Sequence, residues 1–489
     1  MENSGLRWKF VFRVGGFILL LESVFMFLST GVAYFLESPD ANAFVFSGLI
    51  TLATGLALIL PTGIRKEIKF IGKREGYLSV FVSWTLFALF ASLPFFISRE
   101  IPSFTNAFFE STSGITTTGA SILTDVDSMP KGLLFWRSLI QWLGGMGIIV
   151  FSLALMPLLG GGAALLFDAE SSGLTAEKFR PRFSQIAKRL WGIYLLLTVV
   201  LTGLLVLGPM NWFDAVCHAF TTVSTGGFST RQLSIAYWDS AYLETVLTVF
   251  MIIGAINFSL LYFLIKGKIR RLFNDEELRW YLGIIVFASA LVAFSLSKDG
   301  MFSDVGTSVR TAVFQVVSLF TTTGYSTEDF TQWGPFYWIV FLILMLICGC
   351  AGSTSGGLKT VRAVILVKNS FAEFGRLLHP QAIIPIRLNG KAVSFGIVQQ
   401  LLAFAFLYIF IIIFSWGIFC LAGMPFNEAL GASVSGLSNV GPGFGANGPA
   451  GSFVEISVFA KWYMSFLMIV GRLEIFTVLI LFTSAFWKK

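Results

Sequence analysis

The sequence has 489 residues, of which 55% are apolar and 12% are charged, and it has a net charge of +7. This charged fraction is about half of the share usual in soluble domains, and the mean hydropathy is +0.80. Charge-free runs such as 191–207 and 401–419 are long enough to cross a bilayer. The composition therefore excludes a soluble protein and predicts an integral membrane protein of many helices.

Several other classes of protein are disfavoured. The four cysteines all lie in apolar stretches, so no disulfide framework is expected. The two histidines are far apart, and neither a Walker-type motif nor HExxH is present. A membrane-embedded enzyme would need a nucleophile, base or metal cluster, and we identify none that is convincing. We expect neither enzymatic activity, nor an organic cofactor, nor a nucleic-acid partner.

Hydropathy predicts ten spans in chain order. They lie at about 10–36, 43–62, 77–97, 132–158, 186–208, 241–266, 279–297, 334–366, 393–423 and 455–487. The first run is too long for a signal-peptide core and should be a retained helix. With the N-terminus inside, 26 of the 34 Lys and Arg residues fall in cytoplasmic segments. This asymmetry predicts cytoplasmic N- and C-termini.

Four shorter segments lie between the spans, one each between spans three and four, five and six, seven and eight, and nine and ten. Each has about a dozen apolar and small residues, too few to cross, and ends in a Gly/Ser/Thr cluster. Such segments suit re-entrant half-helices, which are tolerated at membrane depth where protein or water satisfies the backbone. From the charge asymmetry we expect all four to open outward.

The four segments share a register. An alanine precedes the terminal glycine by twelve positions in each, at Ala107, Ala215, Ala312 and Ala429. In the second segment the common spacing selects Gly227 rather than Gly226 as the equivalent glycine. The aligned residues are Thr116, Thr117, Thr118, Gly119; Ser224, Thr225, Gly226, Gly227; Thr321, Thr322, Thr323, Gly324; Ser438, Asn439, Val440, Gly441.

Four stretches of this kind indicate an ion filter. Carbonyl and hydroxyl oxygens must replace the water of a dehydrated monovalent cation, and four strands can supply rings of them. Glycine permits positive φ, which lets successive carbonyls point the same way. The alternative is that the small residues are helix-packing seams. Four clusters in register between paired spans favour the filter.

The repeat also predicts the domain organisation. The fold class is all-α integral membrane, with two N-terminal helices and four helix–pore-loop–helix repeats around a pseudo-four-fold cation pore. The expected boundaries are 1–76 for the N-terminal two-helix extension and 77–160, 161–275, 276–391 and 392–489 for the repeats.

On these motifs the chain resembles the Trk/Ktr/HKT superfamily of cation transporters, most closely its bacterial TrkH branch. The resemblance implies potassium (and rubidium) selectivity, a homodimer in the lipid of a bacterial inner (cell) membrane, and a cytoplasmic nucleotide-binding regulatory subunit like TrkA. In this superfamily a serine at the first filter glycine goes with sodium transport. The presence of Gly119 here argues for potassium ion as the transported species.

Span eight is interrupted at its centre by small residues. No ordinary membrane helix tolerates so many glycines, at about 1 kcal/mol each relative to alanine. The helix should unwind below the third filter strand, either as a gate or as a passive kink. The resemblance, in which the matching loop blocks the pore, favours a gate. The candidate gate residues are Gly349, Gly352, Ser353, Thr354, Ser355, Gly356, Gly357 and Lys359. Cys348 and Cys350 lack a third ligand for a metal.

Arg472 lies near the midpoint of span ten. A central arginine costs about 2.5–3.5 kcal/mol, so it should face protein or water. It is either a fixed pore cation that contributes to gating, as in the superfamily, or one half of a buried pair with Glu22 or Glu110. We expect Glu110 to brace the structure and His218 to be packed. Asp214 and Glu428 either attract cations or brace.

Two transport mechanisms remain open. The first is channel-like potassium uptake, and the second is a potassium symporter coupled to protons or sodium. No obvious chain of intramembrane carboxylates or histidines is present for a proton relay, which disfavours tight coupling. The segments 65–74 and 358–391 are candidates for docking a cytoplasmic partner.

Overall fold

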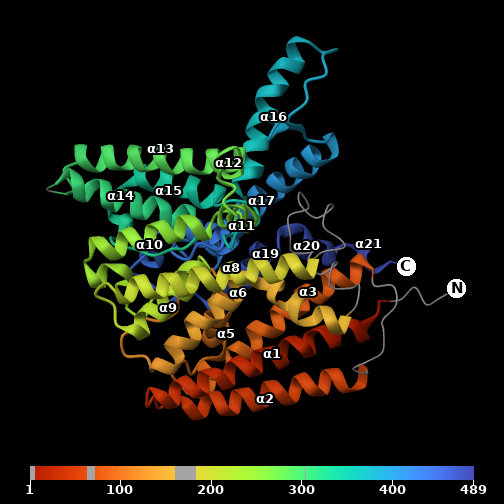
Figure 1. Ribbon diagram of the computed structural model, residues 1–489, viewed down its shortest axis with the longest axis vertical. Helices are drawn as coiled ribbons and strands as arrows, with labels where there is room; N and C mark the ends of the chain where they lie inside the picture. Colours follow the sequence, from red (N-terminus) through yellow and green to blue (C-terminus); the bar gives the residue numbers. More distant parts are fainter. Residues whose placement is uncertain (1–5, 63–71, 160–182, 303, 489) are drawn as a thin grey trace.

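Figure 1 shows the computed structural model of the chain, which is built almost entirely from helices. It describes residues 6–62, 72–159, 183–302 and 304–488, with the backbone alone over 148–159 and 183–186. The predicted boundary at residue 160 and most of the segment 65–74 lie outside the described residues. So do Arg65, Lys66, Lys69, Lys178, Arg180, Arg182 and Lys489, which contribute to the charge asymmetry.

The first two helices form an antiparallel pair, α1 (Trp8–Phe35) and α2 (Ala41–Ile59), which ends in a 3₁₀ turn at Leu60–Thr62. Their backbones come close where Gly16 faces Gly55. A Cβ on Gly16 would stand 2.8 Å from the Gly55 carbonyl oxygen. Small residues permit such close helix packing in membranes. Other faces of α1 contact the first repeat, so the pair is anchored to the body.

Four repeats follow, each with a membrane helix, a short buried helix, an extended strand and a second membrane helix. The first repeat has α3 (Lys73–Ala91), α4 (Leu93–Ile97), α5 (Phe104–Ile115) and α6 (Lys131–Leu159). The second has α8 (Phe183–Val206), α9 (Trp212–Val223), η5 (Ser234–Trp238), α10 (Ala241–Gly254), α11 (Phe258–Ile265) and α12 (Ile269–Phe273).

The third repeat has α13 (Glu276–Lys298), α14 (Val305–Phe320), η6 (Phe330–Gln332), α15 (Pro335–Ile347), α16 (Thr360–Leu378) and a hairpin of β1 (Arg387–Leu388) and β2 (Lys391–Ala392). The fourth has α17 (Phe395–Leu421), α18 (Phe426–Ser438), η7 (Gly445–Asn447), α19 (Val458–Arg472), α20 (Ile475–Leu479), η8 (Ile480–Phe482) and α21 (Ser484–Trp487).

The described part of the chain holds six helices long and apolar enough to cross a membrane, or eight if each bent pair is one span. The prediction of a multi-pass, all-α membrane protein is confirmed. In Figure 1 the start of α1 and the end of α21 lie at the same side of the molecule.

Breaks interrupt the second membrane helix of every repeat. The helix α6 carries a non-helical residue at Gly147, with φ of 43°. The pairs α10–α11 and α19–α20 bend by 107° and 116°, and α15 stops at Ile347 before a loop that ends at α16. The break expected in span eight is therefore present. The spans expected at 241–266 and 455–487 are each a bent pair of helices rather than one straight helix.

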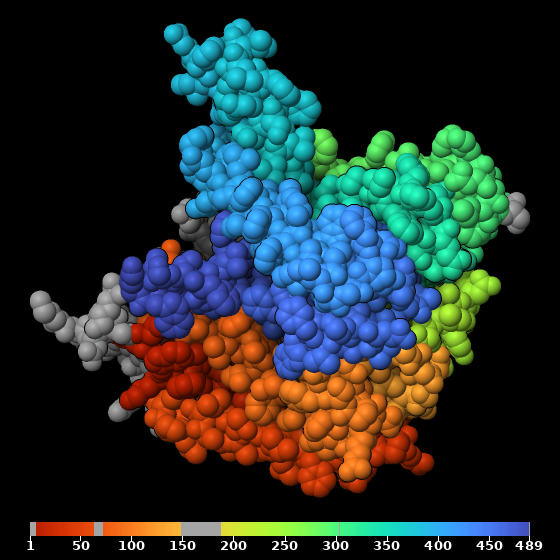
Figure 2. All heavy atoms as spheres, turned by 180° about the vertical axis from the view of Figure 1, so that it is seen from behind, coloured from red at the N-terminus to blue at the C-terminus, as the bar shows by residue number. Residues whose placement is uncertain are grey.

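One part of the molecule projects from the body. Figures 1 and 2 show α16 and the following hairpin standing clear of the packed helices. Exposed apolar side chains lie on this projection: Phe371, Phe374, Leu377, Leu378 and Ile383. The C-terminal part of the segment 358–391 is thus accessible, while residues 360–362 are buried.

Candidate functional site

The four short helices end in the same way. In each, the N–H of a residue two or three positions after the helix bonds a carbonyl five positions earlier in the chain, as in a Schellman motif. The four N–H···O distances are 2.9 Å for Thr118 to Ser113, 2.8 Å for Gly226 to Thr221, 2.9 Å for Thr323 to Ser318 and 3.2 Å for Val440 to Ser435. The sequence register thus corresponds to one backbone conformation repeated four times.

That conformation places two residues of each strand at positive φ. The first is usually glycine in such caps, but here the values are 53° at Thr117, 53° at Thr225, 63° at Thr322 and 56° at Asn439. The second is always glycine, with φ of 85° at Gly119, 77° at Gly227, 78° at Gly324 and 107° at Gly441. Non-glycine residues at positive φ cost about 1–3 kcal/mol each and cluster at functional sites.

The four glycines close a ring. A Cβ on each would meet the carbonyl oxygen that precedes the equivalent glycine in the next repeat. The distances would be 2.3 Å from Gly119 to Gly226, 1.7 Å from Gly227 to Thr323, 2.3 Å from Gly324 to Val440 and 2.7 Å from Gly441 to Thr118. The repeats therefore surround one axis in chain order, and no side chain fits at these four positions.

A hollow lies at one end of this ring. All four glycines line it, together with residues just beyond them such as Ser121, Phe228, Ser326 and Pro442. The ring is otherwise buried: the side chains of Thr116, Thr118, Thr321 and Thr323 are inaccessible to solvent. Their hydroxyls pair within each strand, Thr116 with Thr118 at 2.7 Å and Thr321 with Thr323 at 2.8 Å. Each of these two strands thus holds buried hydroxyl oxygens next to the ring of carbonyls.

The loop between α15 and α16 lies against the other end of the strands. The Thr354 hydroxyl bonds Thr225 at 3.2 Å and the Gly254 carbonyl at 3.1 Å. The N–H of Gly356 donates to the Thr322 hydroxyl at 3.1 Å. A Cβ on Gly356 would stand 2.1 Å from the Ser438 carbonyl oxygen. The loop therefore touches the strands of the second, third and fourth repeats.

Arg472 ties this loop to the first repeat. Its guanidinium donates to the carbonyls of Thr354 at 2.6 Å, Gly144 at 2.6 Å and Gly145 at 3.1 Å. The alternative pairing with Glu22 or Glu110 is wrong. Glu110 pairs with Arg137 at 2.8 Å, and Glu22 accepts no hydrogen bond from any described residue. Arg472 thus lies beside the loop that it was expected to accompany.

The remaining loop residues are held by local contacts. Lys359, with φ of 76°, donates to the Ser355 carbonyl, and Ser353 bonds Ser355 at 2.9 Å. Cys348 donates to the Met345 carbonyl at 2.9 Å, and a Cβ on Gly357 would strike its sulfur at 2.3 Å. Within the described ranges, no group of three or more His, Cys, Asp and Glu residues could hold a metal. The cysteines therefore pack the loop.

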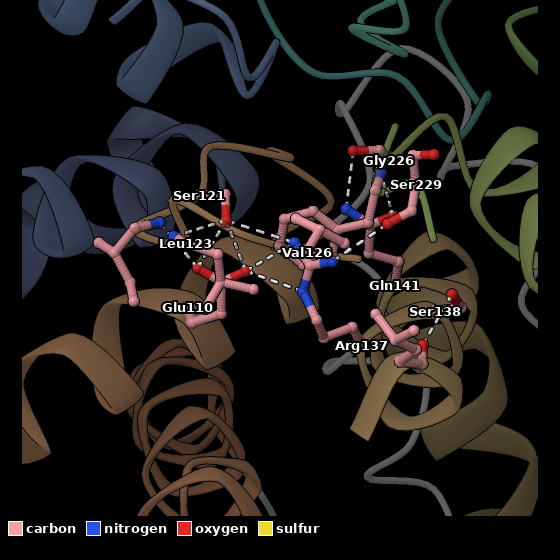
Figure 3. A network of polar contacts seen from close by, with 12 residues as sticks. Glu110, Ser121, Leu123, Val126, Arg137, Ser138, Gln141, Gly226 and Ser229 are labelled. Carbon is pink, nitrogen blue, oxygen red and sulfur yellow. Dashed lines mark hydrogen bonds and ion pairs between the residues drawn. The ribbon is translucent and has the colours of Figure 1, made fainter. Parts of the chain in front are cut away.

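Glu110 and His218 occupy the same register position, nine residues before their glycines. Figure 3 shows Glu110 beside Ser121 and Arg137. Its carboxylate accepts from the N–H of Ile122 at 2.9 Å. His218 donates from Nδ1 to the Asp214 carbonyl at 2.8 Å, and its Nε2 accepts from Ser229 at 3.0 Å. Both side chains hold the backbone just beyond their strands. This agrees with the bracing role expected for Glu110 and the packed position expected for His218.

The two other acids also hold the backbone. Asp214 accepts from Thr230 at 2.6 Å and pairs with Arg231 at 3.4 Å, while Glu428 accepts from the Ala446 N–H at 3.2 Å. Bracing therefore accounts for both.

Two residues behind the strands were missed in the sequence. Arg137 and Gln141, one helical turn apart on α6, both contact the second strand, Gln141 through the Gly226 carbonyl. An arginine and a glutamine on one face of an apolar span are a signal that could have identified them.

Known proteins resemble the chain over almost its full length. The model of a family described as TrkH, cation transport protein, matches residues 41–489. The Trk system potassium uptake protein TrkH of Escherichia coli (strain K12) is 37% identical, covering 99% of this chain and 100% of that protein. The TrkG protein of the same strain is 35% identical, with 100% of both chains covered.

A solved structure agrees in fold. The crystal structure of the potassium transporter TrkH from Vibrio parahaemolyticus matches with a TM-score of 0.89 at 35% identity, covering 99% of this chain and 100% of that one. These proteins are transporters, so the expectation that the chain is not an enzyme is confirmed. Together with the family model, they show that the chain belongs to the TrkH family of cation transport proteins.

Proposed function

We propose that the chain takes up potassium across the cell membrane, through a selectivity filter formed by the four strands. The observation that carries this proposal is the closed ring, in which each glycine abuts a carbonyl of the next repeat. Rings of oxygens replace the hydration shell of a cation. The relatives named potassium uptake proteins supply the identity of the ion.

The short helices contribute electrostatically to the filter. All four end at the ring, at Ile115, Val223, Phe320 and Ser438, so their C-terminal ends face the axis. Each end carries a partial negative charge of about half an elementary charge. A cation at the axis is therefore stabilised without any carboxylate. The ion exchanges water for oxygens, and repulsion between successive ions limits how tightly each is held.

The loop and Arg472 form the proposed gate. The loop touches three strands, and Arg472 joins it to the carbonyls of Gly144 and Gly145. This arrangement obstructs the path below the filter and places a fixed positive charge beside it. Opening requires these contacts to break, and Arg472, at the end of α19, is then free to move away from the loop.

The test is rubidium-86 uptake into proteoliposomes, with potassium, sodium and lithium as competitors, for the unmodified protein and Gly119→Ser. A Cβ on Gly119 would stand 2.3 Å from the Gly226 carbonyl oxygen, so serine must displace that oxygen. We expect block by potassium but not sodium, and relaxed preference in the variant. The control is Gly203→Ser, because a Cβ on that exposed glycine meets nothing within 4 Å. Equal block by sodium would overturn the proposal.

A potassium symporter coupled to protons or sodium is the second candidate. The observation that favours proton coupling is Glu22, a fully buried carboxyl of α1 that has no hydrogen-bond partner among the described residues. Uptake driven by membrane potential alone, without sodium or a pH gradient, would exclude coupling. Loss of pH-driven uptake in Glu22→Gln, with potential-driven uptake preserved, would support it.

We further propose a homodimer in the bacterial inner membrane, with cytoplasmic termini and a cytoplasmic nucleotide-binding subunit like TrkA. The relatives are named as proteins of a Trk system, which supports the presence of further protein components. The exposed apolar residues of α16 offer a contact surface for such a component. Mass measurement in detergent tests the dimer. Labelling of Ser128→Cys from outside, in the exposed segment between α5 and α6, tests the orientation.

A further inference from the structure

A polar pair lies behind the first two strands, inside the protein. Arg137 and Gln141 are four residues apart on α6 and are 2% and 0% exposed. Figure 3 shows both side chains directed from this helix toward the strands. Residues four apart share one face of a helix. Burying a guanidinium and an amide at membrane depth is expensive, so their contacts should matter to the site.

Gln141 uses both ends of its amide on the second strand. Its Nε2 donates to the Gly226 carbonyl at 2.7 Å, and its Oε1 accepts from the Phe228 N–H at 3.0 Å. The side chain thus acts like the backbone of an additional strand. It fixes the direction of the Gly226 carbonyl, the same oxygen that faces the missing Cβ of Gly119.

Arg137 joins the second strand to the first. It pairs with Glu110 at 2.8 Å and donates to the hydroxyl of Ser121 at 3.3 Å, beyond the first strand. It also donates to the Ser229 carbonyl at 3.2 Å and lies 4.0 Å from the Phe228 ring centre, beyond the second strand. One guanidinium therefore bridges the two strands.

The second and fourth repeats have apolar residues at these positions. The register follows from a glycine three residues beyond Gln141: Gly144 packs on the Ile115 carbonyl, as Gly254 does on Val223 and Gly471 on Leu437. In the second and fourth repeats, the residues equivalent to Gln141 are Met251 and Met468, and those equivalent to Arg137 are Leu247 and Met464. All four are buried. Among the three helices aligned by this glycine, only α6 carries the polar pair.

We propose that Gln141, supported by Arg137, is a positioning residue that sets the ion preference of the filter. It does so by holding the Gly226 carbonyl at a fixed place between the first and second strands. The inference rests on the proposed function, because it assumes that the ring selects the ion. The filter is thus symmetric in backbone but is braced by polar side chains on one side.

The first test replaces the amide by the residue that the second and fourth repeats carry. Gln141→Met leaves the Gly226 carbonyl and the Phe228 N–H unpaired in a buried site, a loss worth about tenfold in an equilibrium. We expect the potassium-over-sodium preference in rubidium-86 competition to fall by about that factor. The matched control, Met251→Leu, changes the equivalent position of the second repeat between apolar residues and should keep the preference.

A second variant separates positioning from mere packing. In Gln141→Glu the side chain keeps its size, but an ionised carboxylate repels the Gly226 carbonyl, whereas a protonated one can donate to it. The preference should therefore recover as pH falls. The titratable and charged groups nearby are Arg137, Glu110 and His218, so the unmodified protein must be measured at each pH. A packing role predicts the same preference at every pH.

The outcomes distinguish the two proposals. If sodium and potassium block the unmodified protein equally, both proposals are wrong. If potassium blocks selectively and the monodisperse Gln141→Met protein keeps the full preference, only the brace is wrong. If Gln141→Met cannot be purified, Gln141→Glu decides: a pH-dependent preference beyond that of the unmodified protein supports the brace, and a constant one overturns it.

Discussion

The four repeats are alike at one end of the strands, where the glycine ring lies, and differ from one another at the other end. At the ring, the four repeats share helix caps, positive φ values and glycine–carbonyl contacts. Below it they diverge: α6 kinks at Gly147, two helices bend sharply, and the third repeat contributes a loop that Arg472 reaches from the fourth.

This difference has a physical reason. In the proposed filter, an ion on the axis would be surrounded by its ligands, so each repeat would have to place oxygens at the same height, which requires symmetry. An obstruction needs one element to occupy the axis, so symmetry there would only crowd it. Substitutions at the ring should therefore reduce selective uptake, whereas substitutions below it should increase uptake.

The largest effect is expected for Gly227→Ala at the ring. Its Cβ would stand 1.7 Å from the Thr323 carbonyl oxygen, on a residue with φ of 77°. We expect uptake to fall by about 100-fold or more, because backbone must move. Rubidium-86 uptake at equal protein amounts measures this. Gly203→Ala is the control, and activity close to that of the unmodified protein in Gly227→Ala would contradict the ring.

A smaller loss is expected behind the ring, for Glu110→Gln. Removing the carboxylate leaves Arg137 as a buried charge without its ion-pair partner, which costs about 3–5 kcal/mol. The variant should unfold at lower temperature in detergent and should transport less. Glu428→Gln is the control, because that half-buried side chain accepts from the Ala446 N–H and forms no ion pair with any residue that the structure describes. Equal stability of the two variants would show that the pair contributes nothing.

Below the ring, substitutions should increase uptake instead of reducing it, and the largest increase is expected for Arg472→Gln. The variant loses a charge beside the path and the strong bonds to Thr354 and Gly144. Hydrogen bonds to charged groups contribute about 1.5–3 kcal/mol, so basal uptake should rise about tenfold. Arg472→Lys keeps the charge and should rise less. A decrease in Arg472→Gln would mean that the arginine supports the open state instead.

Much of this architecture could be predicted from the sequence. The spacing between alanine and glycine located all four strands, and the run of glycines located the broken helix before α16. Other breaks have weak signals. The bend after Gly254 depends on Ala255, whose carbonyl accepts from the distant Cys350 N–H at 2.9 Å, and no local pattern encodes that contact.

In the candidate site, too, some features could be predicted from the sequence and others depend on contacts between distant residues. The positive φ of the four aligned glycines could be predicted from the repetition, whereas the positive φ of the threonine or asparagine two residues before each of them could not. Which carbonyl faces which glycine depends on the order of the repeats around the axis. Of the two readings of Arg472, the pairing with a carboxylate was wrong, because bent helices supply carbonyls that accept its hydrogen bonds at membrane depth. Gln141 was missed because its role concerns a different repeat from its own.

The smallest change tests a single hydroxyl between the two ends. Thr322 keeps its place in the ring register, while its side chain accepts from the Gly356 N–H of the loop at 3.1 Å. Thr322→Val preserves the shape and removes that bond, worth about 1 kcal/mol, so basal uptake should rise about fivefold with ion preference unchanged. Thr245→Val, whose exposed hydroxyl bonds its own helix at Ala241, is the control. Altered preference without increased uptake would place Thr322 in the filter alone, and the ring and the loop would then not be connected through this contact.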